Sequence, residues 1–245
     1  EIYHGKKAIT PLPAVYTNSD EEACTLELHL HDQMMHTDLV LTYTIFEEYP
    51  VITRHAAVCH KGEEPITLEK VMSMSVEFQD MDFEMVQLSG AWARERYMKE
   101  RKLEMGIQAI QGINGTGCGA EHNPFLALKR PDATEQQGEV YGFSLVYSGN
   151  FLAQTEVSTF DMTRVMLGIH PEGFSWKLEK GETFQTPEAV LVYSDKGLNK
   201  MSQVYHRLYR RNLMRGNWKE QPRPILLNNW EATYFDFTEE KILDI

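Results

Sequence analysis

The sequence has 245 residues, of which 42% are hydrophobic and 11% aromatic, and its formal net charge is −12. This length and composition are typical of a folded protein with a buried core, in one large domain or two smaller ones. The acidic charge argues against nucleic acid or an anionic membrane as a partner, and no apolar run reaches the roughly 18 residues of a membrane span.

Three cysteines, Cys24, Cys59 and Cys118, are few and odd in number. Such usage favours a reducing cytoplasm over a secreted, disulfide-bonded domain. We therefore expect a cytoplasmic protein.

From about Cys24 to Tyr193, hydrophobic and polar residues mostly alternate, which is the period-two pattern of half-buried strands. Leu26, Leu28 and Leu30 alternate with polar residues, so we expect the opposite face of that strand to meet solvent. Further strands are predicted within 39–45, 66–78, 141–147, 165–169 and 174–178. Turn signals separate them at 61–65, 148–150, 171–173 and 179–181. The pattern predicts a mainly β fold, an antiparallel β-sandwich.

Residues 89–131 depart from this pattern, because five glycines fall between Gly106 and Gly119 and prolines break the run. A long ordered loop in a compact domain is usually functional or forms an interface. Trp92, Arg94, Arg96 and Tyr97 lie in this region, and Trp, Tyr and Arg are enriched at interface hot spots.

A helical period follows from about 198 to 215, with apolar residues in one stripe and arginines in its second half. The stripe consists of Leu198, Met201, Val204, Tyr205 and Leu208, and the arginines are Arg207, Arg210, Arg211 and Arg215. Gly216 and Asn217 predict the end of the helix. We interpret it as a connector, whose arginines pack against the acidic protein or cap the helix rather than bind phosphate.

The last segment, 222–245, reads as a strand, a loop and a helix. Two prolines precede an apolar run at 225–227, a polar and aromatic loop follows, and Thr238 with two glutamates predicts a helix start. The sequence begins with Glu1 rather than Met and stops within this helix. We therefore expect a piece of a larger protein.

The string Asn228-Asn229-Trp230-Glu231-Ala232-Thr233 resembles the start of the catalytic barrel in α-galactosidases of glycoside hydrolase family 36. Two further blocks agree, Gly90-Ala91-Trp92-Ala93-Arg94-Glu95-Arg96 and His122-Asn123-Pro124-Phe125-Leu126-Ala127-Leu128. The resemblance covers essentially the whole chain.

The resemblance implies an N-terminal β-supersandwich domain over 1–197 and a linker helix with its connection over 198–221. It implies that 222–245 is the first strand and partial first helix of a truncated (β/α)8 barrel. The full-length parent would be a retaining α-galactosidase that acts on α-galactoside oligosaccharides such as melibiose and raffinose. In the family both catalytic aspartates lie on later barrel strands, so we assign no catalytic residue here and expect the fragment itself to be non-catalytic.

Trp230 is the candidate substrate-binding residue. The tryptophan that matches it lies in the family's galactose pocket, and an indole offers a flat apolar face and an N–H donor to a sugar. The alternative is that Trp230 fills core between strand and helix, as we expect for Tyr234 and Phe235. Asn229 and Glu231 would orient the loop. For residues 122–125 we favour structural closure of a loop over ligand contact.

Other chemistry is weakly indicated. His29, His31 and His36 with Asp32 invite a metal site, but a solvent face or an interface is the preferred interpretation, so we expect no metal and no cofactor. The carboxylates are scattered and form no evident acid–base pair.

Two other functions remain open at this stage. One is a non-catalytic carbohydrate-binding or oligomerisation β-sandwich module, and the other is a plant-type galactosyl transfer enzyme. The resemblance also implies a homo-oligomer, a tetramer, with the region around Trp92 buried against the barrel or another subunit. Neither nucleic acid nor membrane is expected as a partner.

Overall fold

The computed structural model describes residues 1–115 and 119–245, so that Cys118 and the middle of the glycine-rich run lie outside the described residues. The described chain divides into two compact units, Glu1–Leu213 and Met214–Ile245. Among the described residues, no helix is long and apolar enough to cross a membrane.

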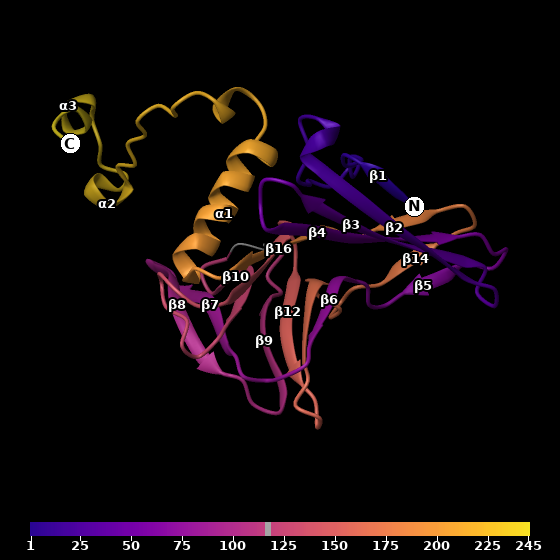
Figure 1. Cartoon of the computed structure of the whole chain (residues 1–245). Helices are drawn as coiled ribbons and strands as arrows, with labels where there is room; N and C mark the ends of the chain where they lie inside the picture. The colour runs from indigo at the N-terminus through magenta and orange to yellow at the C-terminus, as the bar shows by residue number, and fades with distance from the viewer. Residues whose placement is uncertain (116–118) are drawn as a thin grey trace. The chain divides into compact units, whose positions relative to one another are not determined.

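A large antiparallel sheet organises the first unit (Figure 1). Its strands are β1 (Ile2–His4), β2 (Ala23–Asp32), β3 (Thr37–Phe46), β4 (Val51–His60), β7 (Glu84–Ala91), β8 (Arg94–Lys102), β10 (His122–Lys129), β11 (Val140–Val146), β15 (Thr183–Gln185) and β16 (Glu188–Ser194). The order across the sheet is β1-β2-β3-β4-β16-β11-β10-β7-β8, and β15 also pairs with β4. A short 3-10 helix, η1 (Asp20–Glu22), precedes β2.

Two smaller sheets lie against it. One consists of β6 (Met72–Phe78), β9 (Gly106–Gly112), β12 (Phe151–Val157) and β13 (Thr163–Ile169), in the order β6-β13-β12-β9. The other is the pair β5 (Ile66–Leu68) and β14 (Trp176–Leu178). Side chains such as Leu126 and Phe143 from the large sheet and Phe151 and Leu167 from the four-stranded sheet form one buried core between the layers. The predicted mainly β sandwich is confirmed.

Helix α1 (Gly197–Asn212) buries its apolar stripe in a second core on the opposite face of the large sheet. The helix approaches β11 closely at Gly142, where an added Cβ would lie 2.6 Å from the sulfur of Met201. It ends three residues before the predicted 215, with the Leu213 N–H donating to the carbonyl of Tyr209. Because α1 packs within the first unit, the chain divides after residue 213 rather than at the ends of the expected 198–221 linker.

The expected loop over 89–131 is wrong, because the described part of this region forms β8, β9 and β10. All nine residues of β8 are exposed, and β8 is the last strand of the sheet in the described order. A strand exposed on both faces has no hydrophobic alternation, and the sequence pattern could not reveal it. The single strand expected over 66–78 is also two strands, β5 and β6, in different sheets.

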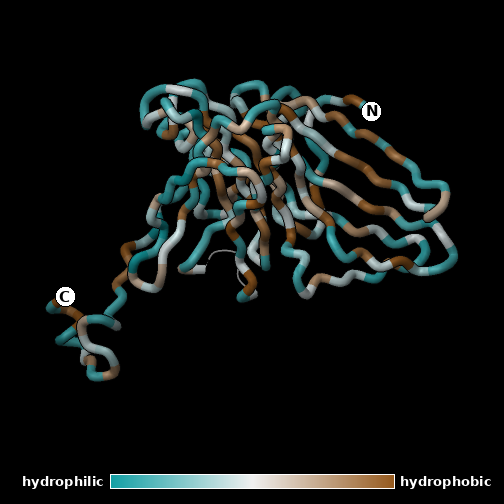
Figure 2. The backbone as a smooth tube through the Cα atoms, turned by 90° about the horizontal axis from the view of Figure 1, so that it is seen from below, coloured by the Kyte–Doolittle hydropathy of each residue, from teal (hydrophilic) through white to brown (hydrophobic). Residues whose placement is uncertain are grey.

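The solvent-facing side expected for β2 is confirmed in the second half of the strand, where His29 and His31 are exposed, and is wrong in the first half. Leu28 and Leu30 are 42% and 50% exposed, whereas Thr25 and Glu27 on the other face are 0% and 9% exposed. The N-terminal segment covers that second face: the Gly5 N–H donates to the carbonyl of Ala23, and the Thr25 hydroxyl donates to the carbonyl of Gly5. Hydrophobic residues follow the long strands near the N terminus (Figure 2), and Leu28 and Leu30 among them are exposed.

The second unit contains η2 (Asn217–Lys219), α2 (Trp230–Thr233) and α3 (Glu239–Leu243). The helix start predicted at Thr238 is confirmed, since its side chain accepts from the Lys241 N–H. The strand predicted at 225–227 is not formed. Ile225 is fully exposed, and within the described second unit no strand pairs with this segment, so its backbone has no ladder to join.

Candidate functional site

The candidate substrate-binding residue, Trp230, opens α2 in the second unit. The side chain of Asn228 accepts from the Trp230 N–H at 3.0 Å, and the Asn229 amide donates to the Thr233 hydroxyl at 2.9 Å. These local hydrogen bonds give partners to polar groups at the start of a short helix. They are consistent with the orienting role predicted for Asn229, which stays a prediction.

The indole of Trp230 lies in an aromatic cluster. The Tyr234 ring lies 5.4 Å away and the Phe235 ring 4.9 Å away between centroids, both edge to face, and Trp230 is still 44% exposed. Tyr234 and Phe235 contact the indole but are 55% and 86% exposed, so the expectation that they fill core is wrong for the described second unit. It leaves part of the indole open, so a sugar contact through Trp230 remains a prediction.

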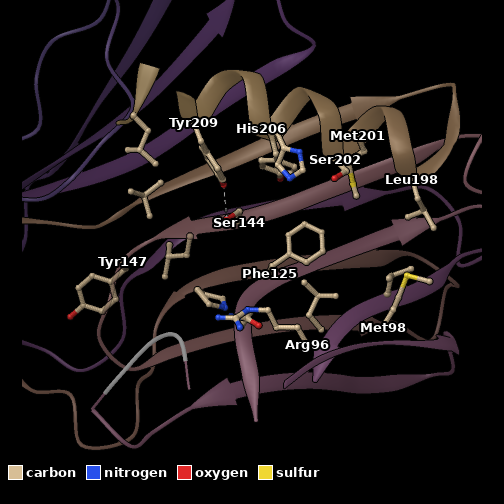
Figure 3. Close-up of a pocket in the computed structure, with 18 of the residues that line it drawn as sticks. Arg96, Met98, Phe125, Ser144, Tyr147, Leu198, Met201, Ser202, His206 and Tyr209 are labelled. Atoms are coloured by element: carbon tan, nitrogen blue, oxygen red, sulfur yellow. Dashed lines mark hydrogen bonds between the residues drawn. The ribbon is translucent and has the colours of Figure 1, made fainter. Parts of the chain in front are cut away.

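A cavity of about 560 Å³ lies in the first unit between α1 and the large sheet (Figure 3). Its walls are mainly apolar: Val86, Leu88 and Met98 line it from the sheet, and Leu198 and Met201 line it from the helix. The string His122–Phe125, expected to close a loop, instead begins strand β10.

Residues of that string hold the cavity wall together. The Phe125 ring packs edge to face on Tyr205 with centroids 5.9 Å apart, and His122 shares a hydrogen bond of 2.9 Å with the Ser89 hydroxyl. Pro124, which cannot donate to a ladder, falls where the β10–β7 register shifts. These contacts support the structural interpretation of residues 122–125.

The polar groups of the cavity do not form acid–base machinery. The Tyr209 hydroxyl donates to Ser144 Oγ at 2.9 Å, and burial raises the pKa of Tyr209 to about 12, so it stays a neutral donor. Glu135 is the one carboxyl group among the described lining residues. Glycoside hydrolysis needs two carboxyl groups facing one bond, and the described lining of this cavity supplies one.

The histidines of the possible metal site have separate partners. His31 is hydrogen-bonded to Asp38 at 2.6 Å, while both turn N–H groups of Met34 and Met35 donate to Asp32. Among the described residues, the group whose ligand atoms lie close enough to hold an ion does not include His31, His36 or Asp32.

A different group, Glu1, Glu27 and His29, has ligand atoms near one another. The Tyr3 hydroxyl and the Lys7 ammonium both donate to Glu27 Oε1, at 2.7 and 3.0 Å. Although burial raises the pKa of Glu27, these donors and His29 outweigh it and hold the pKa below its ordinary value. Hydrogen bonds from Tyr3 and Lys7 thus stabilise the negative charge of the Glu27 carboxylate.

A buried ion pair was missed from the sequence. Lys6 Nζ lies 2.6 Å from Glu188 Oε1, with side chains 1% and 0% exposed. The Val15 N–H donates to the other Glu188 oxygen at 2.7 Å. Burial raises the pKa of Glu188, and Lys6 opposes that shift. No pattern in the sequence links residues 6 and 188. This ion pair, which attaches the N-terminal segment to β16, is therefore visible only in the folded structure.

Comparison with known families identifies both parts of the chain. Residues 1–179 match the glycosyl hydrolase family 36 N-terminal domain, and residues 183–245 match melibiase. This chain belongs to glycosyl hydrolase family 36. The resemblance stated from the sequence is confirmed, and the two matches meet near the end of the sandwich.

Named family 36 relatives are similar over the whole chain. Alpha-galactosidase AgaA of Geobacillus stearothermophilus is 52% identical over 244 residues, and alpha-galactosidase 1 of Pediococcus pentosaceus is 45% identical over 244 residues. The crystal structure of AgaA matches with a TM-score of 0.96, covering 100% of this chain and 34% of that one. A variant of AgaA in complex with raffinose matches with a TM-score of 0.95 at 52% identity, again over 100% of this chain and 34% of its own.

Both alignments include 100% of this chain. They include 33% of the length of each curated relative, so the chain spans about one third of those proteins. The matched third corresponds to the sandwich, α1 and the segment that contains Trp230. The chain therefore corresponds to the N-terminal third of these family 36 relatives.

Proposed function

We propose that the full-length protein is a retaining α-galactosidase that hydrolyses terminal α-D-galactosides of the melibiose and raffinose type. The observation that carries this proposal is 52% identity to alpha-galactosidase AgaA along the whole chain, with a matching fold. The raffinose and stachyose complexes of AgaA variants support an oligosaccharide substrate.

Retention requires a carboxylate nucleophile and a second carboxyl group as acid and base, about 5–5.5 Å apart. In the proposed enzyme both belong to the part beyond this chain. Residues 222–245 would supply the first strand and part of the first helix of a (β/α)8 barrel. The exposed side chains of Ile225 and Leu226 support this, because barrel strands would bury such an apolar run.

Trp230 then follows the first barrel strand, at the end where barrel enzymes bind substrate. In the full-length protein, Trp230→Ala should lower kcat/KM on α-galactosides. Losing a stacking surface and one hydrogen bond costs roughly 2–4 kcal/mol, or about 30- to 1,000-fold.

A matched control is Trp218→Ala, because Trp218 is 48% exposed and lies in η2, away from the proposed pocket segment. Its kinetics should equal those of the unchanged enzyme. If Trp230→Ala folds and retains full kcat/KM, the indole belongs to the core instead.

We further propose a cytoplasmic homo-oligomer, a tetramer. Two observations support it: Cys24 and Cys59 are free thiols, and Trp92 and Tyr97 expose 82% and 57% of their area at one hairpin. Burying such aromatics at a subunit interface is favourable. Light scattering on the full-length protein tests this, and a monomer at micromolar concentration would contradict it.

A further inference from the structure

A small polar cavity of about 180 Å³ lies in the first unit, where β9 ends and β10 begins. Four polar side chains line it: Gln111, Asn114, Glu121 and His122. The rest of its described lining is glycine and alanine, which contribute mainly backbone. The volume is well above the ~30 Å³ that one water molecule occupies in the liquid, so the cavity has room for a small ligand.

His122 presents a hydrogen-bond donor to this cavity. The amide of Gln87 donates to Ser89 Oγ at 2.7 Å, and Ser89 Oγ lies 2.9 Å from His122 Nδ1. Because Ser89 Oγ has no other partner among the described residues, its hydroxyl donates to Nδ1. The ring hydrogen is then on Nε2, which has no partner within the described chain. Nδ1 therefore serves the structural role of residues 122–125, and Nε2–H is available to a ligand.

Gln111 adds a second donor. The Glu172 N–H donates to His170 Nδ1 at 3.0 Å, so the ring hydrogen of His170 lies on Nε2. That N–H donates to Gln111 Oε1 at 2.9 Å. The bond occupies the oxygen of the Gln111 side chain and leaves its NH2 group without a partner among the described residues. His170 is 6% exposed, so this bond holds the Gln111 amide in one orientation.

Glu121 and Asn114 supply the acceptors. Both residues are exposed, and within the described chain no hydrogen bond or ion pair engages either side chain. No lysine or arginine belongs to the described lining, so Glu121 carries the one formal charge there. The cavity therefore combines N–H donors with one carboxylate acceptor and one amide.

This set of groups selects the chemistry of a ligand. An inorganic anion could accept from the N–H donors but would be repelled by Glu121, and a cation could not accept from them. A hydroxyl group both donates and accepts, so a neutral polyhydroxyl compound satisfies the donors and the acceptor together. Because the cavity is smaller than the roughly 300–1,000 Å³ of sites for drug-sized ligands, it suits a single sugar ring.

We propose that this cavity is a non-catalytic binding site for one neutral sugar ring, with His122 and Gln111 donating to its hydroxyl groups and Glu121 accepting from one of them. The site lies in the sandwich, so it goes beyond the proposed hydrolysis and does not depend on it. No aromatic side chain belongs to the described lining, so the sugar gains no stacking surface. The expected Kd is therefore weak, about 1–10 mM.

An NMR titration of the isotope-labelled 245-residue chain with methyl α-D-galactoside tests the proposal. The side-chain amide signals of Gln111 and Asn114 should shift saturably. They should shift equally in Trp230→Ala, because Trp230 belongs to the other unit. The proposal is overturned if neither signal saturates by roughly 100 mM sugar, or if sodium acetate produces the same shifts.

Glu121→Ala tests the acceptor. Losing a hydrogen bond to a charged group should weaken binding about 10- to 100-fold. The fold should be unaffected, because the Glu121 side chain is exposed and has no partner among the described residues. Glu104→Ala is the matched control, since Glu104 is also exposed but does not line the cavity. Equal sugar affinity in the two variants would overturn the proposal.

Crystals of the full-length protein soaked in the same sugar give a second measurement. A sugar ring should occupy the cavity of the unchanged protein and be missing from Glu121→Ala. An empty cavity in the unchanged protein, with or without sugar bound elsewhere, overturns the proposal. Hydrolysis of α-galactosides is assayed separately, so failure of this site leaves the proposed function intact, and an inactive protein leaves this site intact.

Discussion

Replacing Lys6 with methionine removes the cation that faces Glu188 in the buried ion pair. The Glu188 side chain is 0% exposed, so its carboxylate would be left without a charge partner in a low-dielectric site. The group has one way to avoid this cost, which is to take up a proton. From an ordinary pKa of 4.5, protonation at pH 7 costs about 3.4 kcal/mol, because each pH unit costs about 1.4 kcal/mol.

The expected loss in the free energy of unfolding at pH 7 is therefore about 3 kcal/mol, measured by urea denaturation of the 245-residue chain. The loss should shrink as the pH falls. In the variant, folded Glu188 holds its proton to higher pH than the unfolded chain does, so stability is present below pH 4.5 and declines as pH rises above it. At pH 5 the loss should be under about 1 kcal/mol.

A matched variant isolates the charge. Adding Glu188→Gln to Lys6→Met removes the buried carboxylate but keeps an acceptor for the Val15 N–H. The double variant should recover most of the stability lost at pH 7. A loss at pH 7 equal to that at pH 5, or a double variant no better than Lys6→Met, would refute the reasoning.

Two further predictions concern the sandwich. Burial lowers the pKa of His55 from 6.5 to about 4, so its contribution to stability is present above pH 6.5 and is lost as pH falls to about 4. His55→Gln should remove up to about 3 kcal/mol of that pH dependence in urea titrations, and an unchanged slope would contradict the burial of the ring. Gly142→Ala should destabilise the protein by about 1–3 kcal/mol, because its Cβ would lie 2.6 Å from Met201 and 2.8 Å from Tyr205. An unchanged melting temperature would show that α1 does not pack as described.

The sequence correctly predicted those elements in which the buried residues follow the hydrophobic period of the helix or strand. The stripe from Leu198 to Leu208 located α1 to within a few residues, because one face of that helix is buried against the sheet. The turns around Gly149 and Gly173 separate strands where expected. In these places the local sequence and the tertiary environment favour the same structure.

Hydrophobic periodicity gave wrong predictions where the burial of a residue depends on a segment far away in the sequence. Leu28 of β2 is exposed although it belongs to the hydrophobic face of the strand, and Thr25 is buried because the N-terminal segment covers it. Strand β8 has no hydrophobic period because it is an edge. The run at Ile225 has strand propensity but no described neighbour to pair with. Sheet order and cover are properties of the whole fold, which a window of sequence does not contain.

The candidate site shows the same limit. The sequence of residues 228–233 located Trp230, and the structure explains its local geometry through Asn228 and Asn229. The cavity beside α1 and the ion pair Lys6–Glu188 are formed by residues far apart in the chain, so no local sequence motif predicts them.

Hydrolysis of raffinose tests the central proposal most directly. The full-length protein should release galactose from raffinose, and the first product seen by NMR should be the α-anomer, as a retaining mechanism requires. The 245-residue chain should show no turnover, because both catalytic carboxyl groups are proposed to lie beyond it. A folded full-length protein without activity on α-galactosides, or turnover by the 245-residue chain alone, would contradict the account.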